Sequence, residues 1–210
     1  MDKQSFSSNK WTKLADKQTI DITIKALQAN GIDAKFVETS KAAKSEVLAL
    51  IPKGAEVMTM TSVTLDTVSL AAELNESGKY NAIRPKLLKM DYKLQANEMR
   101  KMAAAPDWVV GSVHAVTEDG HLLIASNTGS QLATEAYTGG KLIFVVGTQK
   151  IVKDTDEALE RIYQHSLPLE NQRAQKAYGM NSQVGKILII NKEVQPGRIT
   201  LIFVNEKLGF

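Results

Sequence analysis

Residues 107–150 constrain the fold most, because they hold three strand-like apolar runs that each end in small polar residues. The runs cover residues 108–110, 122–125 and 141–146, and a hairpin signal at 118–120 separates the first two. In an open α/β sheet, ligands bind outside the carboxyl ends of the strands. We therefore expect a functional crevice where these runs end.

Strand-like and helix-like segments alternate through most of the chain. Periodicity and capping signals predict helices near residues 10–30, 39–51, 63–72, 85–104 and after a capping box at 154–157. Short apolar runs predict strands at 34–37 and 55–60. This order predicts a three-layer α/β/α fold with a mainly parallel sheet. Two final runs, 186–190 and 198–204, flank a turn at 194–197 and predict a C-terminal β-hairpin.

Length and composition limit the classes of protein to which this chain can belong. The 210 residues suit a single domain over 10–210 after a loose lead-in at 1–9. A net charge of +3 is too small to indicate a nucleic-acid partner. The absence of cysteine excludes disulfides, thiolate metal sites and a cysteine nucleophile. No apolar run approaches the roughly 20 residues of a membrane helix, and the first residues lack a signal peptide's apolar region. We expect a cytoplasmic protein without membrane contact.

Two turns carry small polar residues ahead of predicted helices. The first follows the strand at 55–60 and contributes Thr61, Ser62 and Thr64. It could cap the helix, cradle an anion at the helix N-terminus, or do both. The second follows the run at 122–125 and contributes Asn127, Thr128, Gly129 and Ser130. Its backbone amides suit a phosphate or carboxylate, and the alternative is a simple strand-to-helix turn.

Two charged residues are candidates for chemistry or binding. Glu135 lies early in the helix after the second turn, where a desolvated carboxylate could act as a general base or nucleophile. Lys150 follows the run at 141–146 and the residues Gly147 and Thr148, so it could hold a substrate anion as a point charge. For both side chains the alternative is an ordinary solvated surface position.

The end of the first run adds Gly111, Ser112 and His114 to the candidate ligand-binding residues. His114 and His121 lie on the two sides of the predicted hairpin, and a nearby carboxylate such as Glu118 could complete a metal site. Nothing in the sequence fixes the spacing that metal ligands require, so we predict no metal.

Four ordered motifs together resemble the lactate-utilisation (LUD) domain family. They are TSVTL at 61–65, AVTEDG at 115–120, NTGSQLA at 127–133 and VVGTQKIV at 145–152. The resemblance runs from about residue 10 to the end and implies the fold shared by ribose-5-phosphate isomerase, glucosamine-6-phosphate deaminase and coenzyme A transferases. It places Glu135 where the isomerase has its catalytic carboxylate. Val113 and His114 stand where the isomerase has acidic residues.

The resemblance implies a role in L-lactate utilisation, the oxidation of lactate to pyruvate. Related proteins carry a cysteine cluster where this chain has Tyr178 and Gly179, so we expect no cofactor here. The chain would then be an accessory component that binds a small anionic metabolite and works beside an iron–sulfur or oxidoreductase partner. Assembly into a homo-oligomer is compatible with the sequence. The alternatives are a stand-alone enzyme that uses Glu135 on a phosphosugar, acyl-coenzyme A or folate-like substrate, and a ligand-sensing module.

Overall fold

A six-stranded parallel sheet forms the centre of the protein. The computed structural model describes residues 10–210, so the lead-in expected at 1–9 lies outside the described residues. The strand order is β1-β10-β7-β4-β2-β3, and every pairing between neighbours is parallel. This confirms the mainly parallel α/β sheet. The strands are β1 (Asp33–Val37), β2 (Glu56–Thr59), β3 (Asn81–Ala82), β4 (Trp108–Gly111), β7 (Lys141–Gly147) and β10 (Ile199–Val204).

Helices cover one face of this sheet. They are α2 (Ser40–Leu50), α3 (Val63–Thr67) and α4 (Leu70–Glu76). Their apolar residues pack against the side chains that alternate along β7 and β10, namely Ile143, Val145, Ile202 and Val204. The remaining side chains of these central strands point to the opposite face, so both faces are buried, which is typical of a central parallel sheet.

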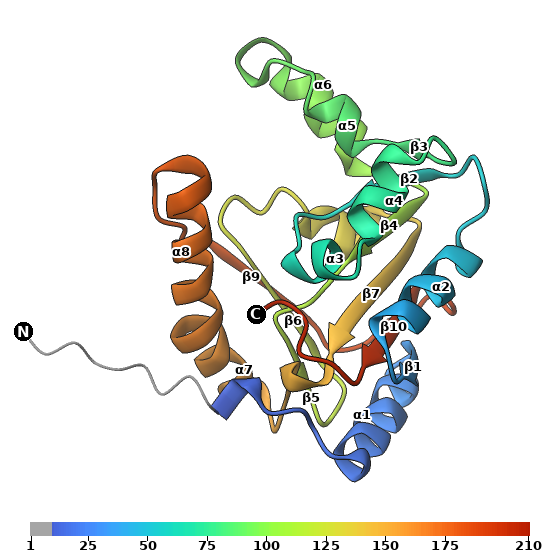
Figure 1. Ribbon diagram of the computed structural model, residues 1–210, viewed down its shortest axis with the longest axis vertical. Coiled ribbons are helices and arrows are strands. Elements are labelled where there is room, and N and C mark those ends of the chain that lie inside the picture. The colour runs from blue at the N-terminus through green and yellow to red at the C-terminus, as the bar shows by residue number, and fades with distance from the viewer. Residues whose placement is uncertain (1–9) are drawn as a thin grey trace, which may run out of the picture.

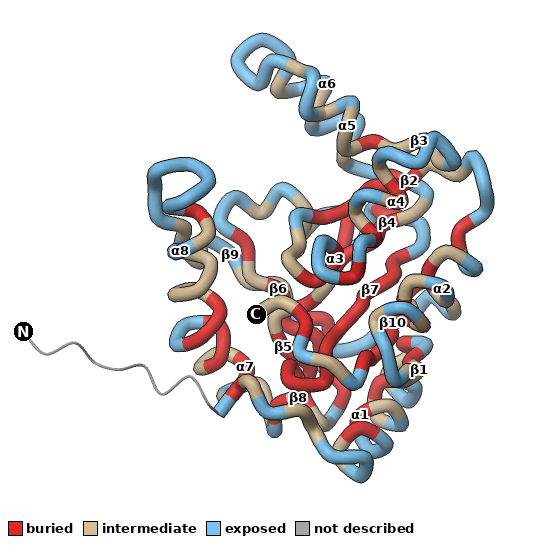
Figure 2. Tube along the Cα trace, viewed as in Figure 1, coloured by how far each residue is buried: buried red, intermediate tan, exposed pale blue. Residues whose placement is uncertain are grey.

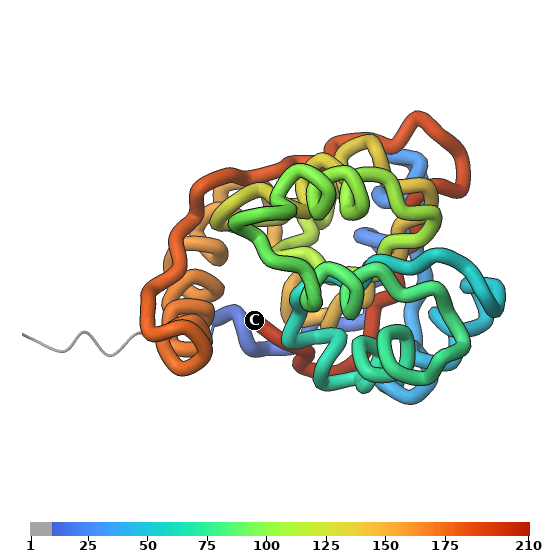
Figure 3. Tube along the Cα trace, turned by 90° about the horizontal axis from the view of Figure 1, so that it is seen from above, coloured from blue at the N-terminus to red at the C-terminus, as the bar shows by residue number. Residues whose placement is uncertain are grey.

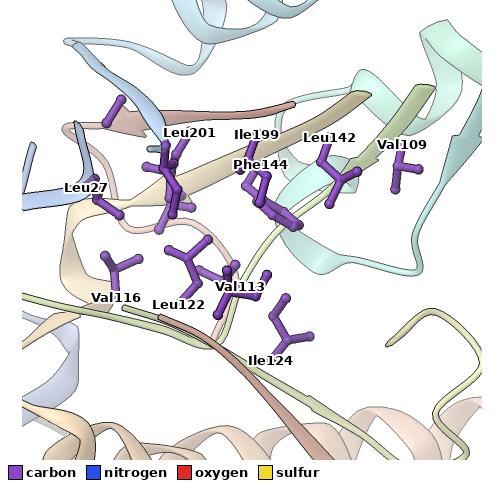
Figure 4. Packing of buried hydrophobic residues seen from close by; sticks show 14 of the residues in the cluster. Leu27, Val109, Val113, Val116, Leu122, Ile124, Leu142, Phe144, Ile199 and Leu201 are labelled. Carbon is purple, nitrogen blue, oxygen red and sulfur yellow. The ribbon is translucent and has the colours of Figure 1, made fainter. Parts of the chain in front are cut away.

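A second sheet, which the sequence does not predict as a separate unit, covers the opposite face. It contains β5 (Ala115–Thr117), β6 (Leu122–Ser126), β8 (Ile151–Val152) and β9 (Lys186–Ile190), in the order β8-β5-β6-β9. Figure 4 shows Leu142, Phe144 and Ile199 of the main sheet lying opposite Val116, Leu122 and Ile124 across the largest apolar cluster. The run expected at 122–125 therefore belongs to this second sheet.

Further helices complete the layers. Helix α1 (Lys17–Ala29) contributes Leu27 to the core between the two sheets. The outer face of the second sheet packs against α7 (Thr155–Arg161) and η4 (Ile162–Ser166), which continue into α8 (Leu167–Tyr178). Helices α5 (Arg84–Leu87) and α6 (Tyr92–Ala104) project away from the body (Figure 1), and Figure 2 shows this arm as largely exposed. In residues 10–210, no helix combines the length and apolar composition needed to cross a membrane.

The two C-terminal strands are present, but they do not pair with each other. Strand β9 pairs antiparallel with β6 in the second sheet, whereas β10 lies between β1 and β7 in the main sheet. The reason is burial: β10 is almost wholly buried, as a central strand must be, and β9 is a partly exposed edge strand. The segment between them is a crossover from one sheet to the other. The hairpin expected at 118–120 is confirmed by the antiparallel pairing of β5 with β6.

Three predicted helices are divided in the structure, and the one expected at 85–104 becomes α5 and α6. The helix expected at 10–30 becomes a short turn, η1 (Lys10–Thr12), followed by α1, because Asp16 caps α1 by accepting a hydrogen bond from the Thr19 N–H at 2.8 Å. The helix expected at 63–72 is split into α3 and α4 at Ser69, whose φ of 54° is left-handed. Two short helical turns, η2 (Thr134–Thr138) and η3 (Thr148–Lys150), flank β7.

The β5–β6 turn packs closely on α1 at Gly120, and a substitution there tests this contact. Its φ is +86°, and an added Cβ would lie 2.6 Å from the carbonyl carbon of Ala26 and 2.7 Å from the nitrogen of Leu27. Gly54 has a similar φ of +80° with no atom within 4 Å of its added Cβ. We expect Gly120→Ala to lower the free energy of unfolding by about 2–5 kcal/mol and Gly54→Ala by about 1–2 kcal/mol.

Urea denaturation of the two variants and the wild type measures this difference. Equal losses for Gly54→Ala and Gly120→Ala would contradict the close contact between the turn and α1.

Candidate functional site

A cavity of about 430 Å³ lies between the turn that precedes α3 and the side of η4–α8. The turns after β2, β4 and β6 line one side, and residues from η4, α8 and the segment that follows α8 line the other. Gly209 and Phe210 also line the cavity, and Figures 1 and 3 both show this end of the chain between α3 and α8. Segments far apart in the sequence thus build one site.

Most of the candidate residues face this cavity. The turns after β2 and β4 come from parallel strands of the main sheet, but the turn after β6 comes from the second sheet. The crevice therefore lies between two sheets and not along the edge of one. The predicted residues that line it are Thr61, Ser62, Thr64, Ser112, His114, Asn127, Thr128, Ser130, Glu135 and Lys150. Their binding roles stay predictions.

Four candidates, Gly111, Gly129, Gly147 and Thr148, do not line the cavity. Thr148 is fully buried, and an added Cβ at Gly111 would lie 3.2 Å from the Met60 side chain. At Gly147 an added Cβ would lie 2.5 Å from the carbonyl oxygen of Glu206. Gly147 therefore lets the end of β7 approach the backbone of the C-terminal segment closely.

Lys150 is a buried amine that lines the cavity, not a solvated surface lysine, since it is only 2% exposed. Its Nζ donates to the Val113 carbonyl (3.1 Å), the Ser112 Oγ (3.2 Å) and the Thr64 Oγ1 (3.3 Å). No carboxylate of residues 10–210 forms an ion pair with it. Burial and the charge of Arg161 hold the pKa of Lys150 well below its usual value.

Arg161 places a second buried positive charge behind the wall of the cavity. Its Nη1 donates to the His114 carbonyl and, at 3.1 Å, to the Ser166 Oγ, and both of these residues line the cavity. Burial lowers the pKa of Arg161 to about 10, so the guanidinium stays charged at neutral pH. This charge makes the neighbouring end of the cavity positive, which favours an anion.

His114 is held as a neutral ring. Its Nδ1 accepts a hydrogen bond from the Ala125 N–H at 3.1 Å, so the proton of the neutral imidazole sits on Nε2. Burial, the charge of Lys150 and the charge of Arg161 lower the pKa of His114 to about 3. At neutral pH the ring is therefore a hydrogen-bond donor through Nε2. Within residues 10–210, no group of three His, Asp or Glu side chains could hold a metal ion.

Glu135 is a buried carboxyl on a π-helical turn. It is 1% exposed, and its Oε2 has no hydrogen-bond partner in the structure. Burial raises the pKa of Glu135 to about 8, so the group is mostly protonated at pH 7. Arg198 holds the turn in place by donating to the carbonyls of Thr134 (3.2 Å), Glu135 (3.1 Å) and Gly139 (3.1 Å). Such π-helical turns are frequent at functional sites.

Sequence reasoning missed a large part of the cavity wall. Ser126 ends the run before Asn127, and Gln131 follows Ser130, so extending that turn by one residue each way would have found both. The other missed residues carry no local signal, because only the packing of distant segments brings them to the site. They include Ser166, Glu170, Arg173, Tyr178, Ser182, Gln183, Gly209 and Phe210, whereas Asp66 lies just two residues after Thr64.

Glu135→Gln should alter how stability depends on pH. The pKa of Glu135 is about 8 in the folded protein and near 4.5 in the unfolded chain, so the folded state binds more protons between these values. Wild-type stability therefore falls as pH rises through this window, and the Gln variant lacks that loss. We expect the stability of Glu135→Gln relative to wild type to increase by up to about 1.4 kcal/mol per pH unit.

The measurement is urea denaturation of both proteins between pH 5 and pH 9, with the exposed Glu76→Gln as matched control. A stability difference that stays constant over this range would mean that Glu135 is not held protonated by burial.

Comparison with known proteins identifies the family and the fold. The family model described as LUD domain matches residues 20–204. The chain is similar to a solved DUF162 family protein from Deinococcus radiodurans, with a TM-score of 0.55, 13% identity, and coverage of 92% of this chain and 100% of that chain. This likeness shows a shared fold alone. A search of curated proteins finds no match.

Weaker likenesses are found to two other solved structures. For eIF2B beta from Chaetomium thermophilum the TM-score is 0.39 at 15% identity, covering 56% of this chain and 44% of that chain. For ribose 5-phosphate isomerase from Plasmodium falciparum the TM-score is 0.34 at 12% identity, covering 54% and 52%. Neither is close enough to support an argument about the site. The family match, which spans most of the sequence, shows that this chain belongs to the LUD domain family.

Proposed function

We propose that this chain binds an organic anion in the cavity and serves L-lactate utilisation as an accessory component in the cytoplasm. The observation that carries the proposal is Lys150, a buried amine that faces the cavity without a carboxylate partner, close to the charged guanidinium of Arg161. The LUD domain family is associated with lactate utilisation in general, which supports the biological setting. The chemistry of the site supports the class of ligand.

Charge balance favours an anion over a neutral ligand. A buried cation without a counter-charge carries a desolvation penalty of several kcal/mol, and an anion that enters the cavity offsets part of it. The neutral His114 can donate from Nε2, and the protonated Glu135 can donate from its carboxyl. Both therefore add hydrogen bonds to an anionic ligand instead of repelling it.

A carboxylic acid with an oxygen on its second carbon suits this arrangement. The carboxylate would lie near Lys150, and the neighbouring hydroxyl or oxo group would exchange a hydrogen bond with Glu135. L-Lactate and pyruvate both belong to this class. Because the sequence has no cysteine, thiolate ligands for an iron–sulfur cluster would have to come from a partner protein, and we propose an oxidoreductase partner for the electron transfer.

Catalysis by Glu135 is the second candidate function, and one observation favours it. Its Oε2 has no partner, and its pKa of about 8 lies close to neutral pH, where a general acid or base is most effective. The carboxyl could give its proton to a substrate carbonyl oxygen, and the carboxylate could later remove a proton from a hydroxyl. A phosphosugar, acyl-coenzyme A or folate-like substrate fits this alternative.

Lys150→Met tests the anion site, with Lys153→Met as matched control because the Lys153 side chain is 80% exposed. Isothermal titration calorimetry with L-lactate, pyruvate and inorganic phosphate measures the affinities. We expect the wild type and Lys153→Met to bind at least one of these anions, and Lys150→Met to bind it at least about tenfold more weakly. Equal affinity in all three proteins would contradict the proposal.

The wild type offers a test that needs no substitution. Of the two groups proposed to hold the anion, Lys150 and Glu135, rising pH ionises Glu135 as it passes the pKa of about 8, and the new negative charge disfavours a bound anion. The affinity should therefore fall between pH 6 and pH 9. An affinity that rises over this range would count against an anion beside these two groups.

The catalytic alternative has its own test. On any identified substrate, Glu135→Gln should lower kcat by about a hundredfold or more, because Gln cannot transfer a proton. Glu76→Gln should leave kcat unchanged. Full turnover by Glu135→Gln would remove Glu135 from the chemistry while leaving the anion site intact.

A further inference from the structure

The cavity is longer than a three-carbon acid. Four residues that are spread along η4–α8 line the cavity, namely Ser166, Glu170, Arg173 and Tyr178. At a helical rise of about 1.5 Å per residue, the segment from Ser166 to Tyr178 extends for about 18 Å. Carbon–carbon bonds of about 1.5 Å make a three-carbon acid roughly 5 Å long. An anion of lactate's size at Lys150 would leave most of this length empty.

The volume supports the same conclusion. At about 430 Å³, the cavity falls in the range of about 300–1,000 Å³ that is typical of sites for larger organic ligands. The end with Lys150 provides buried charge and hydrogen-bond donors, whereas the end formed by α8 has a different chemistry. A ligand that fills the site therefore has two chemically different parts.

Arg173 presents a fixed flat surface at the α8 end. Its Nε and Nη2 each donate to one carboxylate oxygen of Glu170 at 2.7 Å, which fixes the plane of the guanidinium. The pairing raises the pKa of Arg173 above its usual value and matches its charge with a carboxylate. The pair is therefore poorly suited to a second anionic group. A guanidinium plane held in this way is suited to stacking on a planar ring.

Tyr178 adds an aromatic ring beside this surface. The centre of its ring lies 5.6 Å from the Arg173 Cζ, and the residue is 64% exposed although it lines the cavity. An exposed aromatic ring next to a fixed guanidinium offers a planar group two stacking partners. Phe210 also lines the cavity and adds further aromatic surface.

We propose that the ligand is an organic acid that carries a planar aromatic ring, with its acid group near Lys150 and its ring on the Arg173–Tyr178 surface. The placement of the acid group rests on the proposed function. The ring subsite is a separate feature of α8 and accounts for the part of the cavity wall that α8 forms.

Matched pairs of acids test the ring subsite by isothermal titration calorimetry. The pairs are pyruvate with phenylpyruvate, L-lactate with L-phenyllactate, and ribose 5-phosphate with adenosine 5′-monophosphate. We expect the ring-bearing member of at least one pair to bind about 5- to 100-fold more tightly, the range that stacking of one ring typically provides. The pair with the larger gain distinguishes a carboxylic acid from a nucleoside phosphate.

Each outcome has a distinct meaning. Equal affinities within every pair would overturn the ring subsite and leave the anion site intact. Binding of none of the six compounds would overturn both proposals. The cyclohexyl analogue of L-phenyllactate adds a comparison, because it has a similar apolar area without a planar ring. An equal gain for the cyclohexyl analogue would show that the subsite is merely apolar and overturn the aromatic assignment.

Substitutions in α8 test whether Arg173 and Tyr178 cause the affinity gain of the ring-bearing acids. Tyr178→Leu and Arg173→Lys should each reduce the advantage of the ring-bearing acid at least threefold, while the affinity for the ring-free acid stays unchanged. Tyr137→Leu is the matched control, because Tyr137 is 85% exposed and does not line the cavity. An advantage that persists in both α8 variants would place the ring elsewhere and overturn the assignment to Arg173 and Tyr178.

Discussion

The site depends on a buried lysine without a counter-charge. Lys150 holds the end of β4 and the first turn of α3 together through Ser112, Val113 and Thr64. Stability alone does not require a cation here, because apolar packing commonly replaces buried charge without loss. The nearby guanidinium of Arg161, which is charged at neutral pH, provides a positive potential. This arrangement is explained if an anion from outside the chain completes the charge balance.

The sequence predicts the scaffold and part of the site because local signals determine them. Apolar runs followed by small polar residues mark β2, β4 and β6, and the turns after these strands do meet at one cavity. Thr39 caps α2, which begins where the sequence predicts a helix. The LUD motifs contribute what periodicity cannot, namely the family and its general association with lactate utilisation.

Other features follow from tertiary packing and leave no local trace. Nothing in the segment 186–204 distinguishes a hairpin from a crossover, because the core between the two sheets decides where β9 and β10 pair. The burial of Glu135 and Lys150 likewise depends on strands and helices from distant parts of the chain. Residue type indicated that both could be functional, but their shifted pKa values follow only from the burial that the fold provides.

The most direct measurement is the number of protons exchanged when an organic acid binds at pH 8. Calorimetry in buffers of different ionisation enthalpy provides this number. A bound anion raises the pKa of both Lys150 and Glu135, so the complex should take up protons from solution. Net proton uptake is the expected result. Proton release, or binding without any proton exchange, would contradict an anion seated beside these two groups.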